Sequence, residues 1–435
     1  MSQWSVVAAG GVVIAYGAFS RRLSPTPVSG PLVFMVCGLA VGPLGLDLLS
    51  LAKEPHVTQL LLEGALVLLL FTDAARVRAR DLRREGFLPL RLLLFGLPAT
   101  MALGWLIAWP LLPGLSVWEL ALTGIILAPT DAALGQQAVS NPRVPALVRG
   151  GLSVESGLND GLALPFFVLA LAAAGEGHGR TGVLETFLRA LLLSGVIGLA
   201  AGFAGAVLLS WSAAHGWSSP DWRRFLALSV PVIAYALCVQ VQGSGFIGAW
   251  AAGLAFGIRL RAASRDRSTQ ADRGTQADRS AQGSCPLHST VFTERLGLLL
   301  ASLSFLVFGA VILGPTLEHL TWRMAVYALI SLTMIRMLPV ALALTGTGLR
   351  PATVAYLGWF GPRGLASLVF GLIALEEHLP GMTLLSDVIA VTVGLSVVLH
   401  GATAPFLGNR YGDWFAGALR REPDLRENAL PTPVR

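Results

Sequence analysis

The residues best suited to chemistry lie in one stretch, Ser153-Val-Glu-Ser-Gly-Leu-Asn-Asp160, at the start of an apolar run. Ser156 and Asp160 are four residues apart, so a helix would place them on one face. Glu155 and Asn159 are also four apart and would lie on a face about 100° away. The first face offers a hydroxyl and a carboxylate, which are hard oxygen ligands. We predict that Asp160 binds a cation and a proton in turn, which is the minimal device for exchange.

Glu155 and Arg336 form the second feature, because charges inside an apolar run are costly unless they are paired. Arg336 lies in the middle of its run, in Met334-Ile-Arg-Met-Leu-Pro339. We predict that it pairs with Glu155, which would then have a structural role. For Glu155 and for Asp160, the alternative is a hydrogen-bonded polar cluster between helices.

Two other apolar runs are interrupted at their centres, at Ile126-Leu-Ala-Pro-Thr-Asp131 and at Trp359-Phe-Gly-Pro-Arg-Gly364. Proline removes a backbone donor and clashes with the preceding turn, so both helices should break here. Each break carries a charge, Asp131 in one and Arg363 in the other, which a simple proline kink does not explain. An acid can offset facing helix N-termini and an arginine can offset facing C-termini, so we predict crossed, broken helices.

Four further polar residues lie in or near apolar runs. Asp73 is close in sequence to Arg76, and it either lines a cytoplasmic funnel to the site or caps a helix. Glu63, Asp387 and His400 are expected to have structural or interfacial roles.

These polar positions stand out because the rest of the chain is strongly apolar. Its 435 residues are 54% hydrophobic and 13% charged, whereas soluble domains carry roughly 25% charged residues. Apolar runs of about 20 residues, the length that crosses a bilayer, follow one another along nearly the whole chain. Because lipid offers no partner for backbone polar groups, we predict an all-α polytopic membrane protein.

We predict thirteen transmembrane helices, of which the fifth and twelfth are broken. Their expected ranges are 4–20, 30–49, 57–75, 87–110, 115–136, 146–173, 183–212, 222–240, 244–260, 294–314, 322–346, 352–376 and 382–405. The net charge of +6 does not indicate a nucleic-acid partner, because the arginines occupy short loops and form no continuous basic face.

The positions of the basic residues predict the orientation of the chain. With thirteen spans the termini lie on opposite sides, and the loops on the N-terminal side hold only Lys53, Arg180 and Arg323 of the 31 Lys and Arg residues. Because cytoplasmic loops are enriched in Lys and Arg, we expect an external N-terminus and a cytoplasmic C-terminus in the cell inner membrane.

A short internal repeat relates the two halves of the chain. Cys37-Gly-Leu-Ala-Val-Gly42 in the second span is similar to Ala252-Gly-Leu-Ala-Phe-Gly257 in the ninth. Spans that match seven positions apart have opposite directions, so we predict two inverted six-helix repeats, as in many secondary transporters.

We therefore expect one transmembrane domain over residues 1–410. It would contain repeat one at about 4–173, a connector helix at 183–212 and repeat two at about 222–405. A polar, low-complexity cytoplasmic loop is expected at 261–290, and a short cytoplasmic tail at 411–435.

Three stretches resemble the monovalent cation/proton antiporter family, in particular its sodium/proton exchanger branch with an Asn-Asp motif. They are Pro129-Thr-Asp131, Glu155-Ser-Gly-Leu-Asn-Asp160 and, after Trp359, Gly361-Pro-Arg-Gly364. Their order, Leu82-Arg-Arg84 after the third span and the thirteen-span layout extend the resemblance over residues 4–405.

Two positions depart from the family pattern. The family commonly has Leu-Leu between the Ser and the Asn-Asp pair, where this chain has Gly157-Leu158. It often has Glu near the end of the third span, where this chain has Asp73, so the role of Asp73 at the entrance stays open.

The resemblance implies a homodimer with a mobile core that contains the crossed helices. It implies that Asp160 is the ion- and proton-binding carboxylate, assisted by Ser156, Thr130 and Asp131. Asn159 lies where the electrogenic branch has a second aspartate, and Arg336 lies where that branch has a lysine; pairing of Glu155 with Arg336 is implied as well. Since Asn159 has no titratable proton and arginine keeps its own, we expect electroneutral exchange.

Sodium, held at Asp160, Ser156 and Thr130, is the first candidate cation, and potassium and lithium are alternatives. Protons are the ions expected to be exchanged for the cation. Membrane lipid is the other expected partner. A potassium/proton antiporter would use the same residues. A carrier of organic solutes or anions would also use broken helices, but it should present basic groups to its substrate rather than carboxylates and hydroxyls. We expect no enzymatic activity and no cofactor, since no histidine cluster has metal-ligand spacing.

Overall fold

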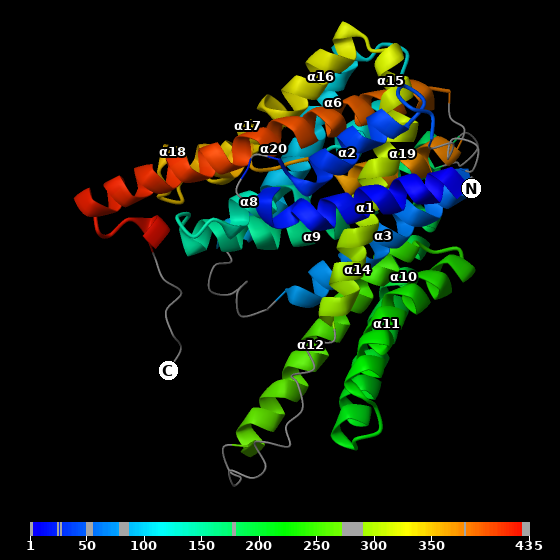
Figure 1. Ribbon diagram of the computed structural model, residues 1–435, viewed down its shortest axis with the longest axis vertical. Coiled ribbons are helices and arrows are strands. Elements are labelled where there is room, and N and C mark those ends of the chain that lie inside the picture. Colours follow the sequence, from blue (N-terminus) through cyan, green and yellow to red (C-terminus); the bar gives the residue numbers. More distant parts are fainter. Residues whose placement is uncertain are drawn as a thin grey trace. The chain divides into compact units, whose positions relative to one another are not determined.

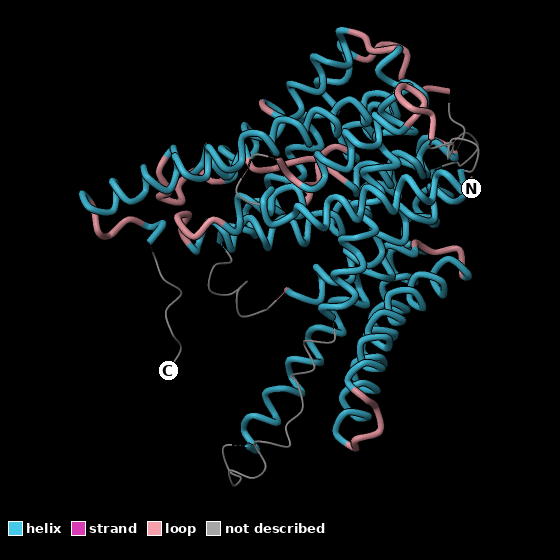
Figure 2. Tube along the Cα trace, viewed as in Figure 1, coloured by secondary structure: helices cyan, strands magenta, loops and turns pink. Residues whose placement is uncertain are grey.

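The computed structural model of the protein describes residues 3–23, 26, 28–48, 55–77, 87–175, 180–271, 290–377 and 380–428. Every regular element in these residues is a helix, and short loops connect the helices (Figures 1 and 2). Ten of these helical segments are long and apolar enough to cross a membrane. Three shorter apolar helices, Gly30–Val41, Val117–Ile126 and Leu365–Glu376, fall at the second, fifth and twelfth predicted spans. Each predicted span thus coincides with an apolar helix.

The chain divides into two compact units, each described by itself. Unit 1 consists of residues 1–63, 79–178 and 301–435, and unit 2 consists of residues 64–78 and 179–300. Two helices, α3 (Pro55–Arg76) and α14 (Thr290–Val307), contribute residues to both.

Unit 1 holds most of the helices. They are α1 (Gln3–Leu23), α2 (Gly30–Val41), α5 (Phe87–Arg91), α6 (Leu97–Leu111), α7 (Val117–Ile126), α8 (Ala132–Ser140), α9 (Ala146–Ala174), α15 (Gly314–Glu318), α16 (Trp322–Leu332), α17 (Met334–Ala343), α18 (Pro351–Trp359), α19 (Leu365–Glu376) and α20 (Met382–Arg421). Two π-helical turns, Leu92–Gly96 and Phe308–Leu313, join α5 to α6 and α14 to α15, and a 3-10 turn follows at Arg426–Asn428.

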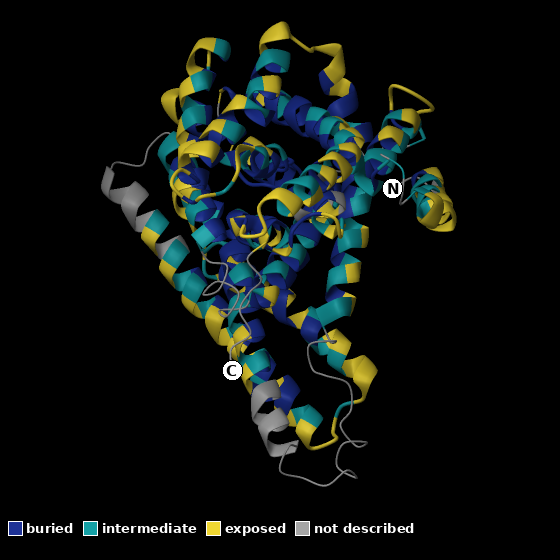
Figure 3. Cartoon of the chain, turned by 90° about the vertical axis from the view of Figure 1, so that its left-hand side faces the viewer, coloured by how far each residue is buried: buried dark blue, intermediate teal, exposed yellow. Residues whose placement is uncertain are grey.

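The interior of unit 1 is built from large apolar side chains on several helices. One cluster brings together Leu88 of α5, Val148 and Leu152 of α9, and Leu357 and Phe360 at the end of α18. Buried residues gather in the interior, whereas α1, the helix beside the N-terminus, is mostly exposed (Figure 3). In a bilayer such contacts act through close packing, because lipid tails are as apolar as the side chains.

Unit 2 contains α10 (Arg180–Ala214), α11 (Pro220–Gln240) and α12 (Gly245–Ala271). A side chain on Gly198 would collide with the Gly248 carbonyl, and one on Gly202 would collide with the Ala252 carbonyl. Small residues on α10 therefore allow its backbone to pack directly against α12, as is common between membrane helices.

Two helices extend past the ends that the sequence predicted. The expected loop at 261–290 is helical through Ala271, the end of α12, and its remainder at 272–289 lies outside the described residues. The expected tail at 411–435 is helical through Arg421, since α20 is 40 residues long. Hydropathy detects only the part of a helix that lies in lipid, whereas alanine and arginine continue a helix readily in water. The inversion of the two repeats stays a prediction.

Candidate ion-binding site

Two helix breaks lie against each other inside unit 1. The first separates α7 from α8 at residues 127–131, and the second separates α18 from α19 at residues 360–364. Their backbones meet directly, because the N–H group of Asp131 donates a 2.8 Å hydrogen bond to the carbonyl of Pro362. Each break contains a proline, Pro129 or Pro362, that has no N–H group to continue the helix. The sequence prediction placed both breaks correctly.

Asp131 caps the N-termini of two half-helices at once. Its Oδ1 accepts a 3.2 Å hydrogen bond from the N–H group of Leu134 in α8, and its Oδ2 accepts one of 2.9 Å from Leu365 in α19. A carboxylate at a helix N-terminus satisfies free N–H groups and offsets the positive end of the helix dipole. The fit is tight, since a side chain on Gly364 would collide with this carboxylate.

Arg363 lies at the opposite kind of helix end. Its guanidinium is fully buried and donates hydrogen bonds of 2.5 and 3.1 Å to the carbonyls of Ala128 and Pro129, just after α7 ends. Ser367 donates a 2.7 Å hydrogen bond to the carbonyl of Ile126, the last residue of α7. A cation at a helix C-terminus offsets the negative end of the dipole. The negative charge of Asp131 thus lies at helix N-termini and the positive charge of Arg363 at a helix C-terminus, so each offsets the helix dipole.

Glu155 of α9 and Arg336 of α17 form a bidentate ion pair. The two contacts are 2.7 Å from Nη1 to Oε1 and 2.8 Å from Nη2 to Oε2, and both side chains are 1% exposed. The guanidinium also lies against the second break, because a side chain on Gly361 would collide with it. Arg336 therefore brings a positive charge to the C-terminal end of α18 while Glu155 neutralises it.

Asn159 of α9 reaches the first break. Its Nδ2 donates a 2.6 Å hydrogen bond to the hydroxyl of Thr130, and both side chains are buried. The other amide atom, Oδ1, is buried and has no hydrogen-bond partner among the residues that the structure describes. The next residue, Asp160, is partly exposed, as is Ser156, whose hydroxyl donates a 2.8 Å bond to the carbonyl of Leu152.

The remaining sequence candidates make contacts of their own. Asp73 belongs to unit 2, where it lies 3.9 Å from Arg76. Glu63 accepts a 3.0 Å hydrogen bond from Gln59, and Asp387 accepts one of 3.0 Å from Thr316. These contacts fit the structural roles expected for Glu63 and Asp387.

His400 of α20 connects the two sides of the second break. Its Nε2 lies 3.0 Å from the carbonyl of Trp359, before the break, and its Nδ1 lies 3.2 Å from the hydroxyl of Ser396. That hydroxyl accepts a 2.7 Å hydrogen bond from the N–H group of Arg363, after the break. No sequence pattern predicts this bridge, because Arg363 is 33 residues from Ser396 and Trp359 is 41 residues from His400 along the chain.

Glu427, in the expected tail, caps the other end of α18. It is buried, and its Oε1 accepts hydrogen bonds of 2.8 Å from the N–H group of Arg350 and of 2.8 Å from the hydroxyl of Thr353. No side chain within α18 caps this terminus. The chain after α20 thus folds back and holds the half-helix that leads into the second break.

Glu119 has a similar role at α7. It forms a capping box with Ser116, and it also accepts a 2.8 Å hydrogen bond from the N–H group of Gly381, which precedes α20. A spacing of Ser and Glu by three residues is a recognisable helix start. The second contact, to Gly381, could not be read from that spacing.

Comparison with known proteins assigns the chain to a family. A family model described as "Sodium/hydrogen exchanger, transmembrane" matches residues 10–410. The chain is 25% identical over 384 residues to the K(+)/H(+) antiporter NhaP of Alkalimonas amylolytica, covering 85% of this chain and 60% of that protein. It is 30% identical over 210 residues to Na(+)/H(+) antiporter 2 of Zygosaccharomyces rouxii, covering 45% of this chain and 25% of that protein. It therefore spans less than two thirds of the length of either relative.

The fold agrees with this placement. The structure of the sodium proton antiporter MjNhaP1 from Methanocaldococcus jannaschii at pH 8 matches with a TM-score of 0.73 and 20% identity, covering 94% of this chain and 98% of that one. This likeness and the apolar helices confirm the predicted all-α, multi-pass fold. Because the family model spans nearly the whole chain, this protein belongs to the sodium/hydrogen exchanger transmembrane family.

Proposed function

We propose that the protein is a secondary active antiporter in which a monovalent cation and a proton compete for Asp160. The crossing of two helix breaks carries this proposal, because charged side chains of opposite sign, Asp131 and Arg363, lie at the helix ends that they compensate. Asp131 accepts hydrogen bonds from the N-termini of α8 and α19, and Arg363 donates to a carbonyl just after the C-terminus of α7. Arg336, paired with Glu155, lies against Gly361 just after α18. Such a crossing makes a polar site within a membrane protein without leaving helix dipoles uncompensated.

The two acids of α9 have different surroundings. Glu155 is buried and paired with Arg336, so we assign it to structure. Asp160 is partly exposed as a residue, although its Oδ1 atom is buried, so an ion would approach the carboxylate from its exposed side. A carboxylate exchanges a proton for a cation at one position, so the two ions would bind in alternation.

Three neutral oxygens would complete the cation site. They belong to the hydroxyls of Ser156 and Thr130 and to the amide of Asn159. The hydrogen bond from Asn159 holds the Thr130 hydroxyl in place, and the buried Oδ1 of Asn159 is an acceptor that a cation could satisfy. Hard cations favour such oxygen ligands.

Sodium is the first candidate for the cation and potassium the second. The potassium alternative is favoured by one observation, since the K(+)/H(+) antiporter relative aligns over 85% of this chain. Everted membrane vesicles that contain a quenched pH-sensitive dye distinguish sodium transport from potassium transport. A cation that the protein exchanges for protons restores the fluorescence of the dye. Na⁺, Li⁺ and K⁺ should be added in turn. A response to none of them would contradict the proposal.

We further propose a homodimer in the inner membrane with a cytoplasmic C-terminus. The arginine-poor loops on the N-terminal side support this orientation. A reporter fused after Arg435 should be active only as a cytoplasmic marker, and an externally active fusion would contradict it. Cross-linking in native membranes should yield dimers, and a product that stays monomeric would contradict the homodimer.

Asp73 is our candidate for the cytoplasmic entrance. An acid beside a pathway attracts cations without binding them tightly. Asp73→Asn should therefore raise the cation concentration for half-maximal exchange while leaving the maximal rate nearly unchanged. Unchanged kinetics would assign Asp73 to structure.

A further inference from the structure

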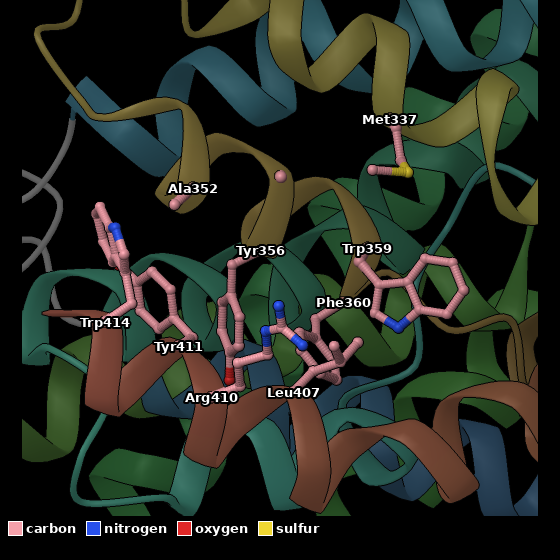
Figure 4. Close-up of a pocket in the computed structure, with 10 residues that line it drawn as sticks. Met337, Ala352, Tyr356, Trp359, Phe360, Leu407, Arg410, Tyr411 and Trp414 are labelled. Carbon is pink, nitrogen blue, oxygen red and sulfur yellow. The ribbon is translucent and has the colours of Figure 1, made fainter.

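A cavity of about 380 Å³ lies in unit 1 among α17, α18 and α20, outside the carboxylate cluster (Figure 4). One wall consists of Tyr356, Trp359 and Phe360 at the end of α18, and another of Tyr411 and Trp414 on α20. The rings pack together, with centroids 4.4 Å apart for Tyr356 and Tyr411 and 5.4 Å apart for Tyr411 and Trp414. The volume falls within the roughly 300–1,000 Å³ typical of small-molecule sites.

The surface beside this cavity is apolar. Leu338 of α17 is 41% exposed and Phe406 of α20 is 62% exposed, and each lies next in sequence to a residue that lines the cavity. Large exposed apolar side chains of this kind on a multi-pass protein are suited to contact with lipid. A hydrocarbon chain would reach the cavity from this apolar side.

Arg410 supplies the one charge in the lining. It is exposed, and its guanidinium extends toward Tyr356 and Phe360 (Figure 4). It forms no ion pair with any residue that the structure describes, whereas nearby Arg143 pairs with Asp413 and Arg350 pairs with Glu422. The cavity thus combines an apolar, aromatic interior with a free positive charge.

We propose that this cavity binds one anionic phospholipid, with an acyl chain against the aromatic walls and the phosphate on Arg410. Arginine binds phosphate through strong, charge-assisted hydrogen bonds. Basic pockets between membrane helices recognise anionic head groups in this way. The aromatic residues Tyr411 and Trp414 suit the boundary between lipid and water.

The bound lipid would touch the part of α18 that leads into the second break. Trp359 and Phe360 line the cavity and directly precede Gly361, against which Arg336 lies. The lipid would therefore stabilise the position of this half-helix. This binding goes beyond the proposed exchange and would hold whichever cation the protein moves.

Native mass spectrometry of the delipidated protein tests the proposal with phosphatidylglycerol and phosphatidylcholine. The wild type should retain one phosphatidylglycerol in preference to phosphatidylcholine. Arg410→Gln should weaken phosphatidylglycerol binding about ten- to hundredfold, the value of one charged hydrogen bond. Ala355→Trp should also abolish it, because Ala355 lines the cavity and the new ring would fill it.

Two matched variants serve as controls. Arg420→Gln removes another exposed arginine of α20, and Ala402→Trp adds a ring at an exposed alanine of the same helix; neither residue lines the cavity. Both should bind phosphatidylglycerol like the wild type. Added phosphatidylglycerol should raise the melting temperature of the wild type and of both controls, but not of Arg410→Gln. Equal binding of the two lipids, or unchanged binding by Arg410→Gln, would overturn the proposal.

Discussion

Asn159 donates a 2.6 Å hydrogen bond to the hydroxyl of Thr130 and so joins α9 to the first helix break. Each partner is followed along the chain by an acid, Asn159 by Asp160 and Thr130 by Asp131. An amide releases no proton under physiological conditions. Asn159 can therefore hold the geometry of the proposed site without adding to the number of protons exchanged.

We predict electroneutral exchange, one cation for one proton. Asp160 is the proposed proton carrier, Asn159 has no titratable proton, and the arginine at position 336 keeps its proton. Glu155 is already engaged by Arg336 in a buried ion pair. Exchange in proteoliposomes should be insensitive to a membrane potential set with valinomycin. A steep dependence on potential would point to Asp131 or Glu155 as a second proton carrier.

The ion pair of Glu155 and Arg336 should behave as a unit. Glu155→Gln or Arg336→Gln leaves one buried charge without its partner, which should cost roughly 3–5 kcal/mol of stability. The double variant should recover part of this loss, measured by thermal unfolding in detergent. The exposed pair of Arg143 and Asp413 is the control. A double-mutant cycle on this pair should give a coupling energy of about 0–1 kcal/mol. Purely additive losses at the buried pair would show that the two residues act independently.

Gly364 should tolerate no side chain. In Gly364→Ala the new methyl group would collide with the Asp131 carboxylate, so the cap on α8 and α19 must shift. We expect a loss of roughly 1–3 kcal/mol and impaired exchange. Gly135→Ala is the matched control, because its methyl group would meet Pro362 at an ordinary 3.9 Å. Normal exchange by Gly364→Ala would mean that the geometry around Asp131 is not needed for transport.

Glu427→Ala should loosen the start of α18. It removes the acceptor for the N–H group of Arg350 and for the hydroxyl of Thr353, which should cost about 1–3 kcal/mol. Glu422→Ala removes only an exposed ion pair with Arg350 and should cost at most about 1 kcal/mol. Thermal unfolding of the two variants compares them directly. Equal stability would show that the folded-back segment does not hold α18.

Much of the fold could be predicted from the sequence, because two strong local signals determine it. Lipid requires apolar helices of limited length, and each of the thirteen predicted spans has one. Pro129 and Pro362, each followed within two residues by a charge, indicated the two helix breaks. The helix ends in water were predicted poorly. Nothing apolar marks where α12 and α20 stop, at Ala271 and Arg421.

The charged residues of the site were predictable for a related reason. A charge inside an apolar run needs a partner, so the pairing of Arg336 with Glu155 could be inferred from the sequence. The helix ends at each break need a compensating charge, which indicated roles for Asp131 and Arg363. The hydrogen bonds of His400 and Glu427 were not predictable. Each bonds to a distant backbone group, the Trp359 carbonyl for His400 and the Arg350 N–H group, 77 residues away, for Glu427. A backbone carbonyl or N–H group has no signature in the sequence.

The central claim is that one carboxylate, Asp160, carries both ions, and Asp160→Asn tests it most directly. The variant keeps the size of the side chain but loses the proton acceptor and the charge. Purified protein should be compared in proteoliposomes with the wild type and with Asp413→Asn, which alters an exposed acid of α20. We expect sodium- or potassium-driven proton movement in the wild type and in Asp413→Asn, and none in a folded Asp160→Asn protein. Robust cation-driven proton movement by Asp160→Asn would contradict the account.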